Sequence, residues 1–156
     1  MNMARPPHLL FVEAPYYAHL AALLRDGAER AAASAGVTHE SVSVPGAFEI
    51  PAAIAAAARL AGGKFDGYVA LGCVIRGETT HYDHICAETA RSLQDLAVRD
   101  GLAIGYGILT VENEAQALVR AAPAGPGGGG RDKGGEAVRA CLALVAVQRR
   151  FAAPGA

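Results

Sequence analysis

The residues from Gly72 to Ile85 (GCVIRGETTHYDHI) bring together side chains that can handle an anion and a proton. His81 and His84 are imidazoles three residues apart, and imidazole exchanges protons near neutral pH. Thr79 and Thr80 precede an apolar-periodic segment and can cap a helix there, whose free backbone N–H groups attract anions. A site that handles both a phosphate and a proton needs these parts.

This segment begins where a predicted strand ends. Tyr68–Ile75 has the length and composition of a strand, and open α/β folds bind ligands at the carboxyl ends of such strands. Tyr16 follows an earlier predicted strand, and Phe48 and Glu49 follow another. In a doubly wound sheet all three junctions lie along one edge, so we expect these side chains to gather there.

A metal site is an alternative for the same segment, because His81, Asp83, His84 and Glu88 offer nitrogen and oxygen ligands. Histidines that share a metal from one helix are commonly four residues apart, as in H-E-x-x-H, and no Cys–His cluster completes the set. We therefore predict that no metal binds. Taken alone, His81 also fits an ordinary surface or capping histidine, and only its setting favours a function.

A glycine-rich segment separates two cations near the end of the chain. Residues 123–131 contain PAGPGGGGR, which predicts a flexible linker, since neither a G-x-x-x-x-G-K-[ST] loop nor a G-x-G-x-x-G turn after the first strand is present. Arg120 and Lys133 flank this linker. Local evidence alone favours the interpretation that both residues are helix-end charges and that Glu49 is a first-turn carboxylate, and not that the three bind a ligand.

The elements that must position these residues alternate along the chain. Strands are predicted at His8–Ala14, Glu40–Val44, Tyr68–Ile75 and Gly101–Leu109. Helices are predicted at Tyr17–Ser34, Phe48–Leu60, Thr80–Arg99, Asn113–Ala121 and Glu136–Phe151. This alternation predicts an α/β fold with a four-stranded parallel sheet covered by helices on both faces, in three layers. So small a sheet under so many apolar helix faces suggests burial against copies of the same chain.

Composition limits the classes of protein to consider. The 156 residues predict a single domain over 1–156, with a flexible N-terminus over 1–7. With 14 basic and 15 acidic residues, nothing indicates a nucleic-acid or membrane surface, and the start lacks the apolar region of a secretory signal. The three cysteines, Cys73, Cys86 and Cys141, fall in apolar segments, which predicts buried reduced thiols in a cytoplasmic protein.

Four motifs together resemble the lumazine synthase family. They are PGAFEIP at 45–51, GCVIRGETTHYD at 72–83, GILTVEN at 107–113 and DKG at 132–134, and the resemblance runs from about His8 to Phe151. It implies a flavodoxin-like strand order, 2-1-3-4. It also implies condensation of 5-amino-6-ribitylaminouracil with 3,4-dihydroxy-2-butanone 4-phosphate to 6,7-dimethyl-8-ribityllumazine, phosphate and water, in riboflavin biosynthesis, without cofactor or metal.

The resemblance implies a role for each matching residue. His81 would be the general acid/base, whereas His84 is expected on the helix face. Arg120, with Lys133 as a further cation, would bind the phosphate of the butanone together with backbone N–H groups around Gly77, Glu78 and Thr79. The pyrimidine and its ribityl chain would contact the remaining matched residues, which are Tyr16, Ala47, Phe48, Glu49, Val74, Ile75 and Tyr106.

The resemblance also implies a site shared between subunits. In the family the site lies between the subunits of a pentamer, so Tyr106 and Arg120 would reach it from an adjacent chain. The spacing between Arg120 and Lys133 is longer than usual by the glycine-rich run, in a linker that lies near the five-fold axis. We therefore expect a free pentamer instead of a sixty-subunit capsid. A lumazine- or flavin-binding protein without turnover, and a shell-forming protein, are the alternatives.

Overall fold

The computed structural model describes residues 5–153, and its centre is a parallel four-stranded sheet. The strands are β1 (His8–Glu13), β2 (Thr38–Ser43), β3 (Gly67–Ile75) and β4 (Ile104–Val111), in the order β2-β1-β3-β4. The helices are α1 (Ala18–Ser34), α2 (Ile50–Leu60), α3 (His81–Arg99), α4 (Glu114–Ala121) and α5 (Lys133–Ala152), with a short helix η1 (Ala47–Glu49) before α2. The predicted fold class and strand order are confirmed.

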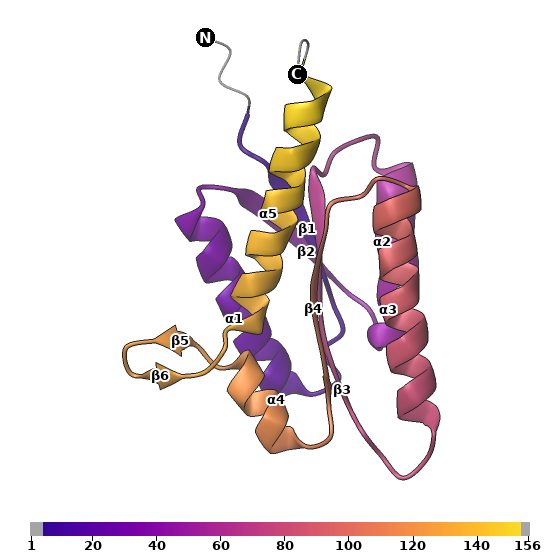
Figure 1. Cartoon of the computed structure of the whole chain (residues 1–156), viewed down its shortest axis with the longest axis vertical. Helices are drawn as coiled ribbons and strands as arrows, with labels where there is room; N and C mark the ends of the chain where they lie inside the picture. The colour runs from indigo at the N-terminus through magenta and orange to yellow at the C-terminus, as the bar shows by residue number, and fades with distance from the viewer. Residues whose placement is uncertain (1–4, 154–156) are drawn as a thin grey trace.

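The helices form a layer on each face of the sheet, as Figure 1 shows. α1 and α5 cover one face, where Phe11 and Val69 pack against Ala28 and Val138. α2 and α3 cover the other face, and Leu10 belongs to the core cluster there. The central strands β1 and β3 are buried on both faces, which explains their continuous apolar runs.

Several element boundaries differ from the predicted ranges, and backbone conformation explains two of these differences. Gly101 has a φ of +68°, the left-handed conformation that ends a helix, so it follows α3 and does not begin β4. Helix α5 begins at Lys133 and not at Glu136, because Asp132 caps it through a bond from the Gly135 N–H to its carboxylate, 3.3 Å long. The start of this helix lies against α1, where a Cβ on Gly134 would meet the Leu24 carbonyl oxygen at 2.0 Å.

The glycine-rich segment folds into a small antiparallel ribbon, β5 (Ala124–Gly125) and β6 (Gly128–Gly129). Its base is closed by backbone bonds from the Gly130 N–H to the Pro123 carbonyl, 3.0 Å, and from the Asp132 N–H to the Ala122 carbonyl, 2.9 Å. The extra residues are therefore contained in the ribbon. Its flexibility stays a prediction.

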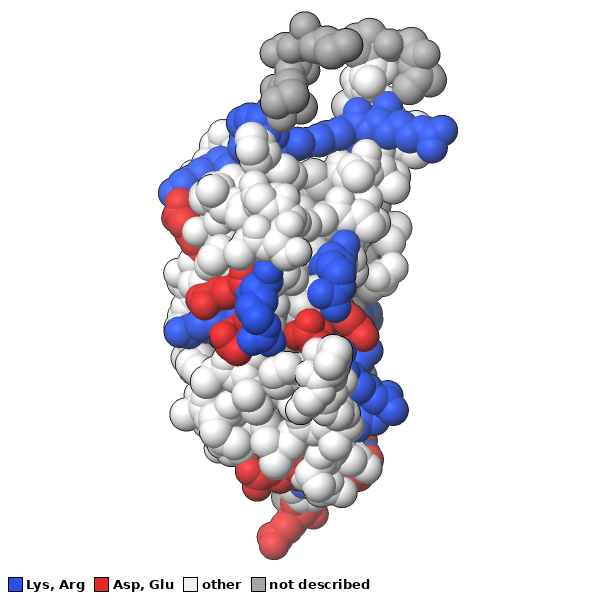
Figure 2. All heavy atoms as spheres, turned by 90° about the vertical axis from the view of Figure 1, so that its left-hand side faces the viewer, with Lys and Arg blue, Asp and Glu red and all other residues white. Residues whose placement is uncertain are grey.

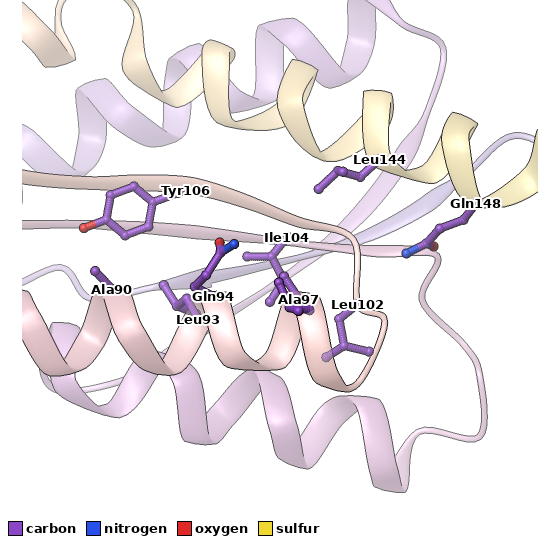
Figure 3. A pocket seen from close by; sticks show the side chains of 10 residues that line it. Ala90, Leu93, Gln94, Ala97, Leu102, Ile104, Tyr106, Leu144 and Gln148 are labelled. Carbon is purple, nitrogen blue, oxygen red and sulfur yellow. The ribbon is translucent and has the colours of Figure 1, made fainter.

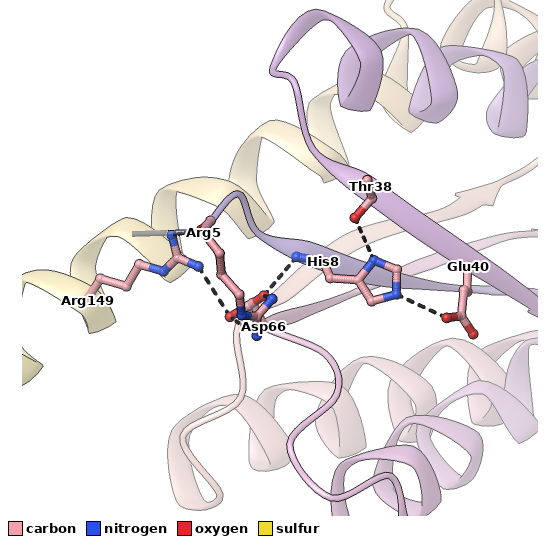
Figure 4. Close-up of polar contacts among 6 residues, drawn as sticks. All are labelled: Arg5, His8, Thr38, Glu40, Asp66 and Arg149. Atoms are coloured by element: carbon pink, nitrogen blue, oxygen red, sulfur yellow. Dashed lines mark hydrogen bonds and ion pairs between the residues drawn. The ribbon is translucent and has the colours of Figure 1, made fainter. Parts of the chain in front are cut away.

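The amino-terminal end of the sheet is fastened by Asp66 (Figure 4). This carboxylate accepts hydrogen bonds from Arg5 at 3.0 Å, from Arg149 at 3.3 Å and from the His8 backbone N–H at 2.8 Å. It thereby joins the beginning of β1 to α5. Of the predicted flexible stretch over 1–7, residues 1–4 lie outside the described residues.

The prediction that the cysteines are buried thiols holds only in part. All three cysteines are free thiols, but Cys86 is half-buried, whereas Cys73 and Cys141 are buried as predicted. Burial raises the pKa of Cys73 to about 11 and that of Cys141 to about 12. Phe151, in the last turn of α5, is 74% exposed.

The surface has no strongly biased charge on the face drawn in Figure 2, where side chains of both signs lie together in the middle of the molecule. None of the helices within residues 5–153 is long and apolar enough to cross a membrane. Among the same residues, no three or more His, Cys, Asp and Glu side chains are grouped so that they could hold a metal ion.

Candidate active site

A hollow of about 500 Å³ lies at the carboxyl ends of β1 and β3, and we call it the junction hollow. It is lined by Tyr16, Tyr17, Gly46, Ala47, Phe48, Glu49, Val74, Ile75, His81 and Ile85. The three strand-to-helix junctions therefore meet at one place, as their positions along a parallel sheet require. Three of these lining residues had not been predicted as site residues from the sequence. Tyr17 and Gly46 are adjacent in sequence to predicted residues, and Ile85 lies on α3 together with His81.

Local backbone structure presents the aromatic side chains of this hollow. At the end of β1 the buried Glu13 accepts hydrogen bonds from the Nε of Arg25, 2.9 Å long, which ties the strand to α1. Tyr16 follows, 74% exposed, with its ring 5.0 Å from that of Tyr17 in an edge-to-face arrangement. Phe48 in η1 is 57% exposed. Exposed rings beside a hollow can stack on a planar ligand.

His81 is the first residue of α3, and its side chain lines the junction hollow. Its backbone N–H donates to the Thr79 hydroxyl at 3.3 Å, so Thr79 supplies a bond at the helix start, whereas Thr80 makes no side-chain capping bond. His84 does not line the hollow. An imidazole at this position can exchange protons with a ligand in the hollow.

The segment Gly77–Thr79 lies exposed between β3 and α3. Within residues 5–153 no protein acceptor takes the backbone N–H of Gly77, Glu78 or Thr79. Successive free N–H groups before a helix are suited to an anion.

A second hollow, about 260 Å³ in volume, lies beside β4, and we call it the edge hollow. It is lined by Tyr106, Gly107, Ile108, Leu109, Thr110, Arg120, Lys133 and Glu136. Arg120 donates to the Gln116 carbonyl at 3.0 Å, and Lys133 forms an ion pair with Glu136. Because the ribbon is closed at its base, Arg120 and Lys133 reach the same hollow despite the long linker. Glu136, one helical turn after Lys133, had not been indicated.

The two hollows have no lining residue in common, so one chain does not bring His81 together with Arg120. Each hollow does contain a partly buried tyrosine. Burial raises the pKa of Tyr17 in the junction hollow and of Tyr106 in the edge hollow, with a smaller contribution from neighbouring thiols. Both hydroxyls therefore stay protonated near neutral pH and can donate hydrogen bonds.

These features define a class of protein, namely an α/β enzyme of flavodoxin-like fold with a small-molecule site at the carboxyl edge of its sheet. Comparison with known sequences is more specific. The sequence model of the family described as 6,7-dimethyl-8-ribityllumazine synthase matches residues 6–149. The chain belongs to this family.

Two curated relatives cover almost the whole chain. The 6,7-dimethyl-8-ribityllumazine synthase of Sphingopyxis alaskensis is 54% identical over 144 residues, which are 92% of this chain and 96% of the relative. The 6,7-dimethyl-8-ribityllumazine synthase 1 of Rhizobium meliloti is 49% identical over 156 residues, 98% of this chain and 99% of the relative.

Proposed function

We propose that the protein condenses 5-amino-6-ribitylaminouracil with 3,4-dihydroxy-2-butanone 4-phosphate to 6,7-dimethyl-8-ribityllumazine, phosphate and water, in riboflavin biosynthesis. The main support is the similarity to enzymes of that name along nearly the full length of both chains. The predicted site residues that line the junction hollow and the edge hollow fit this chemistry.

The pyrimidine belongs in the junction hollow. Tyr16 and Phe48 offer exposed rings on which a planar heterocycle can stack. Glu49 is an acceptor for the ribityl hydroxyls. Main-chain groups of Ala47 and Phe48, and of Val74 and Ile75 at the end of β3, provide further contacts with the ring.

The butanone phosphate needs cations and N–H donors. Arg120 supplies a planar fork that fits two phosphate oxygens, and Lys133 supplies a second positive charge in the same hollow. The free N–H groups of Gly77–Thr79, next to His81, complete the set. The phosphate would thus lie between the edge hollow of one chain and the junction hollow of its neighbour.

His81 would move the protons. The 5-amino group of the pyrimidine attacks the ketone carbonyl, and water leaves as an imine forms. A proton is then removed next to the carbon that carries phosphate, and phosphate leaves. The enol that remains takes a proton on its terminal carbon and becomes a ketone, and the ribityl-bearing nitrogen attacks this ketone and closes the ring with loss of a second water. Each step needs a proton given or taken near neutral pH, which suits one imidazole beside the reacting atoms.

A shared site requires another chain, and an apolar groove between α3, β4 and α5 offers the surface for it. This α3–β4–α5 groove encloses about 620 Å³ and is lined by Ala90, Leu93, Gln94, Ala97, Val98, Leu102, Ile104, Tyr106, Leu144 and Gln148. Figure 3 shows these side chains between the two helices. Covering the groove with a second copy would place Tyr106 and the edge hollow beside the neighbour's junction hollow.

We further propose that five chains close into a free pentamer of cytoplasmic single-domain subunits. The ribbon at 124–129 adds length to a linker that lies near the five-fold axis in the family, which disfavours a capsid. Light scattering should give a mass close to five times the 15.9 kDa of one chain. A particle near sixty subunits would contradict this.

The experiment that tests the function is a two-substrate assay on the purified protein, followed by the absorbance of the lumazine and by release of inorganic phosphate. We expect both products to appear in equal amounts. Tight binding of the pyrimidine or of the lumazine without phosphate release would instead identify a binding protein that does not turn over.

A further inference from the structure

Arg76 follows β3 directly and lies between two carboxylates from different elements. Its Nε donates to Glu112 at 2.8 Å, and its terminal nitrogens lie 3.1 Å and 3.3 Å from the two carboxylate oxygens of Asp83. Asp83 is in the first turn of α3, and Glu112 follows β4. The guanidinium also stacks on the Tyr82 ring, 4.3 Å from its centre.

We propose that Arg76 is a positioning residue for phosphate binding, which holds the Gly77–Thr79 segment in shape and neutralises the two carboxylates beside it. The inference deepens the proposed function and rests on the assignment of that segment to the phosphate. Arg76 does not itself line either hollow.

Arg76 fastens the start of the Gly77–Thr79 segment to two other elements. The Arg76–Asp83 pair joins the residue before the exposed segment to the first turn of the helix after it, so it closes the loop. The Arg76 backbone N–H donates to the Val111 carbonyl at 3.0 Å, which fixes the same residue to β4. A loop held at both ends presents its N–H groups in one arrangement, and such preorganisation lowers the entropy that anion binding must overcome.

The contacts of Arg76 also extend to α4, the helix that carries Arg120. Glu112, which accepts from Arg76, donates its backbone N–H to the side-chain oxygen of Gln116 in α4, 2.9 Å away. Arg120 lies in the last turn of that helix and donates to the Gln116 carbonyl. Arg76 therefore connects the Gly77–Thr79 segment to α4, the helix that carries Arg120 to the edge hollow of the same chain.

Arg76 also offsets the charge of the two carboxylates that it contacts. Asp83 and Glu112 place two negative charges next to a segment that is to bind an anion, and Arg76 is the cation that contacts both. Its donors are occupied by these carboxylates, which raise the pKa of Arg76 further above its usual range. Without Arg76 the two carboxylates would repel an approaching phosphate dianion.

The test is phosphate binding by two variants of Arg76. In Arg76→Gln we expect inorganic phosphate, titrated by calorimetry, to bind at least about tenfold more weakly, since a charge-assisted contact is lost and two carboxylates are left unpaired. The KM for the butanone phosphate should rise by a similar factor, with a smaller change in kcat and in the KM for the pyrimidine. Arg76→Lys should recover part of the loss, because it keeps the charge.

Arg91 offers a matched control. It also bridges two carboxylates, Glu88 at 2.7 Å and Asp95 at 2.8 Å, but on the exposed face of α3 and outside both hollows. Arg91→Gln removes the same charge and a similar set of ion pairs, and should leave phosphate binding unchanged.

Two results would overturn the inference. One is phosphate affinity in Arg76→Gln within twofold of the unmodified protein, and the other is an equal rise in KM for both substrates, which would indicate general loosening of the fold. If Arg76→Gln does not fold, either of these two results in Arg76→Lys would overturn the inference. Absence of turnover in the unmodified protein would refute the proposed function, whereas the calorimetric comparison would still decide the role of Arg76.

Discussion

His81 and Arg120 line different hollows of the same chain, His81 at the carboxyl edge of the sheet and Arg120 beside its edge strand β4. The hollows share no residue, and the apolar α3–β4–α5 groove reaches the edge hollow through Tyr106. If both side chains act on one substrate, the site must be completed by a second copy.

Replacing His81 by alanine should lower kcat by about a hundredfold to ten-thousandfold, the usual contribution of a general acid/base. Binding of the ribityl pyrimidine, measured by fluorescence titration, should survive, because the aromatic and carboxylate side chains of the junction hollow remain. His84→Ala is the control, since His84 is on the same turn but does not line the hollow. Equal effects of the two substitutions would refute the role of His81.

Replacing Arg120 by alanine should raise the KM for the butanone phosphate by at least about tenfold, because a charge-assisted bidentate contact with the phosphate is lost. The KM for the pyrimidine should stay nearly unchanged. Arg131→Ala removes the same charge from an exposed residue that lines neither hollow, and should behave like the unmodified protein. An unchanged KM in Arg120→Ala would contradict the phosphate assignment.

A charge in the α3–β4–α5 groove should separate the subunits. Leu144 lines the groove and is 40% exposed in one chain, so Leu144→Glu would place a carboxylate in an apolar contact between copies. Light scattering should then give single chains, and turnover should be lost although Leu144 lines neither hollow. Leu60→Glu, at a side chain 84% exposed and outside the groove, is the control. An active pentamer of Leu144→Glu would exclude this groove as the contact.

The buried thiols predict how stability depends on pH. In the folded chain the pKa of Cys73 is raised to about 11 and that of Cys141 to about 12, from an ordinary value of 9.0. Below the ordinary pKa the thiols stay protonated in both states. Between the ordinary pKa and the raised pKa of the folded chain, a thiol ionises only in the unfolded chain. The free energy of unfolding should therefore fall with rising pH in that range, by about 1.4 kcal/mol per thiol for each pH unit.

Urea unfolding between pH 8 and pH 11 measures this slope. Tyr17, Tyr68 and Tyr106, whose pKa values are also raised by burial, add to it in the same direction at the upper end of the range. Cys141→Ala lowers stability at every pH by creating a cavity, but its decline with pH should be shallower. An unaltered slope in this variant would show that the thiol does not titrate as described.

Much of the fold follows from short-range patterns in the sequence. The period of the apolar residues distinguishes strands from helices, and their alternation requires a parallel sheet, so the residues at its carboxyl edge could be expected to meet. The start of α5 was harder to predict, because Gly134 and Gly135 are poor helix formers. Both are nevertheless helical, and position 134 requires glycine because the helix approaches the Leu24 carbonyl too closely for any side chain.

The part of the site that sequence did not reveal depends on contacts between distant elements. Asp83 and Glu112 are 7 and 36 residues from Arg76, with no motif of spacing to connect them. The only sequence signal that Glu136 and Tyr17 belong to the site is that they are close in sequence to Lys133 and Tyr16. The resemblance to a family had already implied that Arg120 reaches the site from an adjacent chain, and the separate hollows of His81 and Arg120 agree with this, since β4 lies at the edge of the sheet.

The most direct test of a site shared between chains is to mix two inactive variants. At a butanone phosphate concentration well below its KM, His81→Ala and Arg120→Ala should each retain about a tenth of the unmodified rate or less. In oligomers refolded from an equal mixture, about a quarter of the sites should combine the intact His81 of one chain with the intact Arg120 of its neighbour. We predict that lumazine formation recovers to about a quarter of the unmodified rate. Activity no higher than that of the separate variants would contradict the shared site.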